Sequence, residues 1–115
     1  MESILNTIKK LLGISVDYEA FDMDIIININ MAINILYQLG VGPSGFFIRD
    51  ESETWSDYLG DSPNLEMVKT YIFLKVKQAF DPNQNSNITQ SYDNQIKELE
   101  WRLNVQVDPG DKDNE

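Results

Sequence analysis

The chain has 115 residues, the length of one compact domain, and its 19 acidic against 9 basic side chains give a formal net charge of −10. It contains no Cys and no His, which excludes disulfides, thiolate and imidazole metal sites, and every catalytic dyad or triad built on those residues. The acidic balance also disfavours binding along a nucleic-acid backbone, which requires clustered Lys and Arg.

The first predicted element is a short amphipathic helix over residues 4–12. Its apolar residues recur at helical spacing and lie on one face. Ser3 can cap the start of this helix, and Gly13 can end it. Lys9 and Lys10 suit the negative end of the helix dipole.

Residues 20–39 carry two competing patterns. Between Ile27 and Ile35, apolar and polar residues alternate as in a strand. The same segment also has an apolar stripe at helical spacing, acidic residues near its start and Gly40 at its end. We predict a helix, because the run is too long for an ordinary strand.

Residues 40–60 are rich in turns, with a brief extended piece predicted at residues 46–48. The glycines of residues 40–45 match G-x-G-x-x-G, but a dinucleotide site needs a strand before that motif, and here a predicted helix precedes it. We therefore interpret these glycines as turn residues. Thr54 and Asp57 fit a capping box, which predicts a short helix over residues 55–59 that ends at Gly60.

Two longer helices are predicted next. The first is opened by Ser62 and Pro63, with Pro63 at its first helical position, and ends before Pro82; it is apolar around most of its circumference over residues 65–80. A helix of this kind is central, or it is covered on a second side by another subunit. A polar linker at residues 83–87 leads to a last amphipathic helix, whose apolar stripe contains Ile88, Tyr92, Ile96, Leu99 and Leu103.

Together these elements predict an all-α fold. It is a small bundle of about four helices with a short extended or hairpin insertion between the second and third, forming a single domain over residues 1–107. The apolar-free segment 108–115 has a net charge of −3 and is predicted to be a disordered acidic tail. No window of about 18 apolar residues and no signal-peptide pattern is present, so we expect neither a membrane interaction nor export from the cytoplasm.

Acidic residues cluster at three places. The D-x-D pairs at residues 22–24 and 111–113 lack the third ligand, the glycine and the distal Glu of a calcium loop. The acids of residues 50–57 lie in a polar loop, where nothing predicts the burial that a general acid needs. We interpret Asp22 and Asp24 as charges at a helix N-terminus, the pair at residues 111–113 as part of a disordered tail, and the loop acids as solvated surface. We expect neither a metal nor a cofactor.

Five aromatic residues are candidates for a protein–protein interface. Four of them lie in the acidic connecting region, and the fifth departs from the apolar stripe of the last helix. Trp and Tyr are enriched at interface hot spots, but they also cover the cores of small domains, and the sequence leaves both interpretations open. The five are Phe46, Phe47, Trp55, Tyr58 and Trp101.

Six segments form a recognisable series along the chain. They are FDMDI at residues 21–25, QLGVGPSGFFI at 38–48, TWSDYL at 54–59, VKTYIFLKV at 68–76, FDP at 80–82 and IKELEWRL at 96–103. Their order and spacing resemble the small head–tail connector, or neck, proteins of tailed bacteriophages and prophages of Gram-positive bacteria. The likeness covers about residues 1–105.

This resemblance implies an all-α structural virion protein without a catalytic site. It implies a homo-oligomeric ring in the virion neck, assembled on the portal protein from copies that can be monomers in isolation. The ring would extend the DNA channel and dock the next neck or tail-completion protein, while DNA passes nearby without specific binding. An acidic surface is compatible with that role, because it repels the duplex.

Two other functions remain open from the residues alone. An acidic inhibitor or DNA mimic would space its carboxylates like phosphates on one exposed face, whereas here the acids are scattered over loops and tail. An enzyme that uses carboxylates alone would need two acids facing one cleft, with at least one shielded from water.

Overall fold

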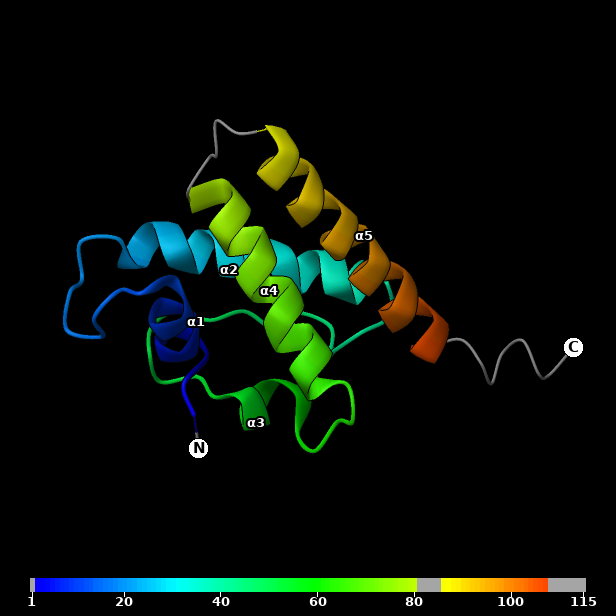
Figure 1. The fold of residues 1–115 in the computed structure, drawn as a ribbon. Coiled ribbons are helices and arrows are strands. Elements are labelled where there is room, and N and C mark those ends of the chain that lie inside the picture. Colours follow the sequence, from blue (N-terminus) through cyan, green and yellow to red (C-terminus); the bar gives the residue numbers. More distant parts are fainter. Residues whose placement is uncertain (1, 81–85, 108–115) are drawn as a thin grey trace, which may run out of the picture.

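The computed structural model describes residues 2–80 and 86–107, and it confirms the all-α prediction. Five helices follow one another in the chain (Figure 1), and the described residues contain no strand. The helices are α1 (Ile4–Leu12), α2 (Asp22–Gln38), α3 (Trp55–Leu59), α4 (Leu65–Phe80) and α5 (Ser86–Val107).

Helix α1 has the ends that the sequence predicts. The Ser3 hydroxyl accepts a hydrogen bond from the backbone N–H of Asn6, and Gly13 ends the helix with a φ of 81°. Ser3 also forms an isolated antiparallel bridge with Thr54, the residue that caps α3. The starts of α1 and α3 are therefore held side by side.

Helix α2 is continuous, so the helical stripe prevailed over the strand-like alternation. It begins at Asp22, with Asp22 and Asp24 in its first turn, and is followed by Leu39 as its C-cap. One face enters the core through Ile25, Ile29, Ala32, Ile33 and Leu36.

The insertion between α2 and α3 has no hairpin, and residues 46–48 form no strand. Instead, the side-chain amide of Asn30 on α2 hydrogen-bonds to both backbone groups of the buried Ile48. The backbone of Ile48 is therefore paired with a helix side chain in place of a second strand. The capping box of α3 is present as predicted, with Thr54 and Asp57 bonded reciprocally.

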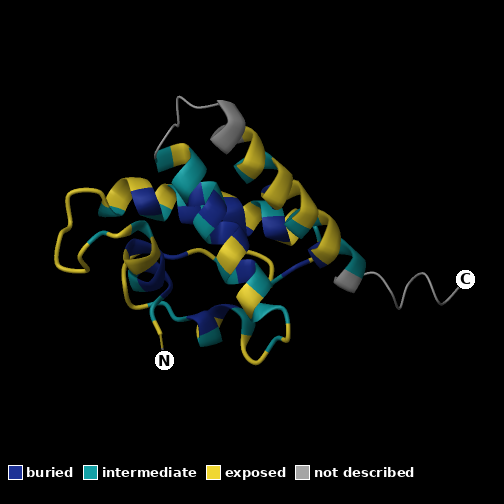
Figure 2. Ribbon diagram, in the orientation of Figure 1, coloured by how far each residue is buried: buried dark blue, intermediate teal, exposed yellow. Residues whose placement is uncertain are grey.

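Helix α4 is the central element, and it begins at Leu65, two residues after the predicted start at Pro63, which lies in a turn. It packs against α1, α2 and α5, which resolves the choice left by its apolar circumference in favour of a central position. Figure 2 shows the buried segments concentrated where α4 crosses α2, while the outer side of α5 is exposed. Tyr71 and Ile72 of α4 are fully buried in this core.

Helix α5 lies along α4 (Figure 1) and closes the bundle. The Tyr71 hydroxyl donates to Glu100 at 2.8 Å, and Asn104 donates to the backbone oxygen of Leu39 at 3.1 Å. The predicted linker was too long, since α5 begins at Ser86. The predicted acidic tail, residues 108–115, lies outside the described residues.

Candidate functional site

The five aromatic candidates have different surroundings. Trp55 and Tyr58 are buried in the core, and Phe46 is half-buried and stacks on Tyr58 with ring centroids 4.9 Å apart. Phe47 and Trp101 are exposed, with 50% and 66% of their surface accessible. Only these last two present their rings outward from the subunit.

Gly42 allows the glycine-rich turn after α2 to lie against the buried Tyr58 ring. Its φ is 88°, and a Cβ added there would lie 2.8 Å from a ring carbon of Tyr58. The turn therefore lies against the Tyr58 ring, on which Phe46 also stacks. A helix, not a strand, precedes this segment, so it lacks the context of a dinucleotide-binding loop.

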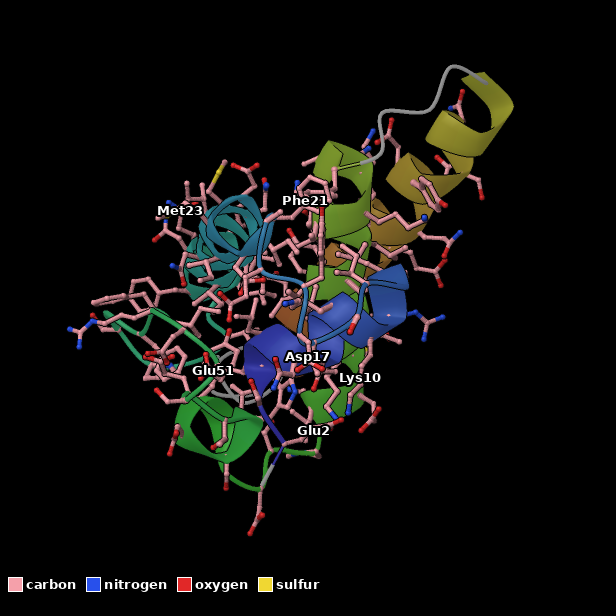
Figure 3. The ribbon with its side chains drawn as sticks, turned by 90° about the vertical axis from the view of Figure 1, so that its left-hand side faces the viewer. Glu2, Lys10, Asp17, Phe21, Met23 and Glu51 are labelled. Atoms are coloured by element: carbon pink, nitrogen blue, oxygen red, sulfur yellow. The ribbon has the colours of Figure 1, made fainter. Side chains whose placement is uncertain are left out.

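The outward face of α2 is apolar, which is unusual for a helix at a protein surface. Met23, Ile27 and Met31 recur at four-residue spacing and are all exposed. In Figure 3, Met23 projects away from the rest of the molecule at the start of α2. A contiguous exposed apolar stripe of this kind is typical of an interaction surface.

Two adjoining hollows lie beside this stripe, between α2 and the last turns of α4. Their volumes are about 410 and 170 Å³, and both are lined by Asn28 and Ala79. We call the two together the α2–α4 groove. Its lining residues are Phe21, Asp24, Ile27, Asn28, Met31, Ala32, Ile35, Lys75, Gln78, Ala79 and Phe80.

Aromatic rings form one end of the α2–α4 groove. Phe21 contacts Phe80 edge to face at 5.2 Å between centroids, and Tyr18 contacts Phe21 in the same manner at 5.6 Å. The start of α2 is thereby fixed against the end of α4. Asp24 supplies a carboxylate at this end of the groove, while Lys75 lies in the second hollow.

A buried lysine positions the segment that leads into the groove. The Lys9 side chain is 1% exposed, and its Nζ lies 2.7 Å from Asp22 Oδ1. The same ammonium donates to the backbone oxygens of Val16 and Tyr18 at 3.1 and 2.7 Å. Lys9 was expected to serve the helix dipole, but burial gives it a larger role, because it connects α1, the loop and the start of α2.

Four acids, Asp17, Glu19, Asp22 and Glu51, line a separate hollow of about 270 Å³. Figure 3 shows Asp17 and Glu51 on this side of the molecule. Three of the four are exposed, and the partly buried Asp22 is the partner of Lys9. The hollow therefore lacks a shielded carboxylate that is free for acid–base chemistry.

The acids of the connecting loop have structural partners. Asp50 accepts a hydrogen bond from the backbone of Ser52, and hydrogen bonding to Ser52 lowers the pKa of Asp50. Glu53 accepts from the backbone of Arg49 and Asp50. These carboxylates fix the loop conformation in addition to lying at the surface.

Trp101 lies on the outer side of α5 with charged neighbours. Lys97, Glu98 and Arg102 are exposed around it, and Arg102 pairs with Glu98 at 2.7 Å. These neighbours carry two positive charges against one negative. The exposed charged side chains of the described part of α5 thus carry a net charge of +1, in a chain whose net charge is −10. The half-buried Asp93 and Glu100 are hydrogen-bonded to Gln78 and Tyr71 of α4.

The α2–α4 groove was not predicted, although its signal was present in the sequence. Ile27 and Met31 belonged to the strand-like alternation, and they fall outside the helical stripe that enters the core. Apolar residues on the polar side of a helix indicate a second contact surface. Phe21 and Phe80 carried no comparable signal, because their contact depends on how α2 crosses α4.

No described helix has the length and apolar character needed to cross a bilayer. Within residues 2–80 and 86–107, no three acidic, His or Cys side chains gather in a way that could hold a metal ion.

The chain was compared with protein-family models, with curated proteins and with solved structures. A family model described as "Phage connector protein" matches residues 4–110. No curated protein and no solved structure matches the chain significantly.

Proposed function

Since the chain belongs to the phage connector protein family and so has a structural, non-catalytic head–tail connector role, we propose that it forms a ring on the portal of a tailed phage. In this proposal the ring sits in the virion neck, extends the DNA channel and docks the next neck or tail-completion protein. The observation that carries the proposal is the family match, which extends over residues 4–110.

The surface of the subunit supports an assembly role. Exposed apolar side chains occur on α2, in the loop after it and on α5, at positions that include Met23, Phe47 and Trp101. Single exposed apolar residues are ordinary, but a groove beside an apolar stripe is typical of a contact with another protein. A subunit between two neighbours and two axial partners needs several such surfaces.

The net charge of the chain supports the proposal that the ring extends the DNA channel. A formal net charge of −10 on 115 residues repels the phosphate backbone, so DNA can slide past without being held. The sequence motifs, by their order, lead us further to propose a phage of a Gram-positive host.

The test is to mix the purified protein with its cognate portal. We expect a complex that co-migrates on size exclusion, gives a discrete subunit count in native mass spectrometry and appears as an added ring in electron micrographs. A protein that remains a free monomer at saturating portal would contradict the portal proposal. Mass spectrometry of purified virions tests the location separately. Absence of the protein from intact particles would contradict a neck position.

A further inference from the structure

We propose that Trp101 of one copy inserts into the α2–α4 groove of a second copy of this chain, as the lateral contact of the ring. The proposal rests on the ring function above and adds the two surfaces that would meet. It is carried by three features of the subunit, which concern shape, charge and direction.

The first feature is the match between a projecting ring and a hollow. Trp101 is the most exposed aromatic side chain of the described residues, and the larger hollow of the groove has a volume of about 410 Å³ with Phe21, Ile27 and Phe80 among its walls. Enclosing an indole typically buries about 150–250 Å² of mainly apolar surface. Aromatic and aliphatic walls are suited to receive it.

The second feature is charge. The exposed face around Trp101 is slightly basic, with Lys97 one turn before the indole. The larger hollow contains Asp24 and the smaller one contains Lys75, so the acidic end of the groove is the one at Asp24. Two copies of an acidic chain repel each other in most orientations, so a contact between a basic and an acidic surface is the favoured one.

The third feature is direction. In Figure 1 the start of α2 and the end of α4 lie on one side of the molecule, and the last turns of α5 lie on the other. A contact between two different surfaces on opposite sides is head-to-tail, and it gives a closed ring when the rotation between subunits closes. A stable interface typically needs about 800 Å² from each partner, so this contact alone should be weak between free copies.

The test uses the absence of Cys from the chain. Two variants that keep Trp101 are mixed at high concentration and oxidised, and the mixed disulfide dimer is measured. They are E98C, at an exposed position one turn before the indole, and a size-tagged I27C. The matched control pairs E98C with size-tagged L11C, because Leu11 and Ile27 are equally exposed at 51% and 50%, and Leu11 lies on α1. Adding Trp101→Ala to the E98C chain should remove the difference between the two pairs. We expect about tenfold more mixed dimer from the groove pair, because the contact raises the local concentration of the two thiols.

Equal yields from the groove pair and the control pair would overturn the proposal. An excess of E98C homodimer over both mixed dimers would also overturn it, since two copies would then meet through α5 alone. Adding Asp24→Lys to the I27C chain should lower the yield, and adding Lys97→Glu to the E98C chain should restore it. Failure of the charge exchange to restore the yield would exclude the stated orientation.

The outcome is independent of the portal experiment. A portal-bound ring without the groove crosslink would leave the proposed function in place and remove this contact. A groove crosslink with no portal binding would support the contact and remove the portal proposal.

Discussion

The side-chain amide of Asn30 makes two hydrogen bonds with the backbone of Ile48, 18 positions away. Its Nδ2 donates to the Ile48 oxygen at 3.0 Å, and its Oδ1 accepts from the Ile48 N–H at 2.8 Å. Ile48 is buried, so its backbone groups are removed from water and need these partners. The amide therefore takes the place of a strand neighbour for Ile48.

Replacing Asn30 with Asp should destabilise the fold. Asp keeps the size of the side chain, but its carboxylate cannot donate to the Ile48 oxygen, so a buried acceptor loses its partner. We expect the free energy of unfolding to fall by about 1–3 kcal/mol, measured by urea denaturation. Asn34→Asp, on an exposed position of the same helix, is the control and should change stability little. Equal losses in the two variants would show that added charge on α2, and not the Ile48 bonds, is responsible.

Local signals in the sequence predicted most of the fold. The Ser3 cap, the glycine stop of α1 and the Thr54–Asp57 capping box depend on residues within a few positions of each other, and all were confirmed. Helix type in α2 was also predicted, because a run of that length is incompatible with an ordinary strand. The absence of a hairpin was not predicted, because the partner of Ile48 is a side chain on a helix 18 positions away in the sequence.

The candidate site was harder to predict for the same physical reason. Trp55 and Tyr58 have side chains that suit a core or an interface, and only the crossing of helices decides which. In the structure the Trp55 indole donates to the buried Thr7 hydroxyl at 3.0 Å, a contact across 48 positions. The exposure of Trp101 was easier to predict, because its position outside the apolar stripe of α5 was visible in the sequence.

A second prediction concerns Lys9, whose ammonium is buried with three oxygen partners. Lys9→Met keeps most of the side-chain volume but leaves the Asp22 carboxylate and two backbone oxygens without their donor. Removing one member of a buried pair typically costs about 3–5 kcal/mol, and we expect a loss of unfolding free energy near the lower end, because Asp22 is 26% exposed. The measurement is chemical denaturation monitored by circular dichroism.

Lys10→Met is the matched control for Lys9, because Lys10 is its exposed neighbour on the same helix. It removes the same charge and should shift stability by no more than about 0.5 kcal/mol. The double variant Lys9→Met with Asp22→Leu should recover part of the loss, since no unpaired carboxylate remains. Similar effects of the Lys9 and Lys10 variants would contradict the assigned role of the buried ammonium.

A third prediction compares two glycines of the same turn. Gly42 and Gly45 have φ values of 88° and 75°, so Ala at either position adopts an unfavourable backbone conformation, at a cost of about 1–2 kcal/mol. A Cβ at Gly45 meets no atom within 4 Å, whereas one at Gly42 lies 2.8 Å from the Tyr58 ring. Gly42→Ala should therefore lose about 1–3 kcal/mol more than Gly45→Ala in thermal or urea unfolding. Equal losses would mean that the Tyr58 ring moves aside without cost.

The last prediction concerns pH and the buried tyrosines. Burial raises the pKa of both Tyr58 and Tyr71 well above the ordinary value, and the hydrogen bond to Glu100 raises that of Tyr71 further. The folded state therefore keeps these protons where the unfolded chain releases them, so stability is full below pH of about 10 and decreases as the pH rises above it. Urea unfolding between pH 8 and 11 should show this decrease, and Tyr58→Phe and Tyr71→Phe should each reduce its slope.

At pH 7 the two variants should differ, because the Tyr58 hydroxyl is buried with no hydrogen-bond partner among the described residues, whereas Tyr71 donates to Glu100. Tyr71→Phe should lose about 1–2 kcal/mol, and Tyr58→Phe should be neutral or stabilising. A large loss in Tyr58→Phe at pH 7 would show that this hydroxyl has a partner in solution.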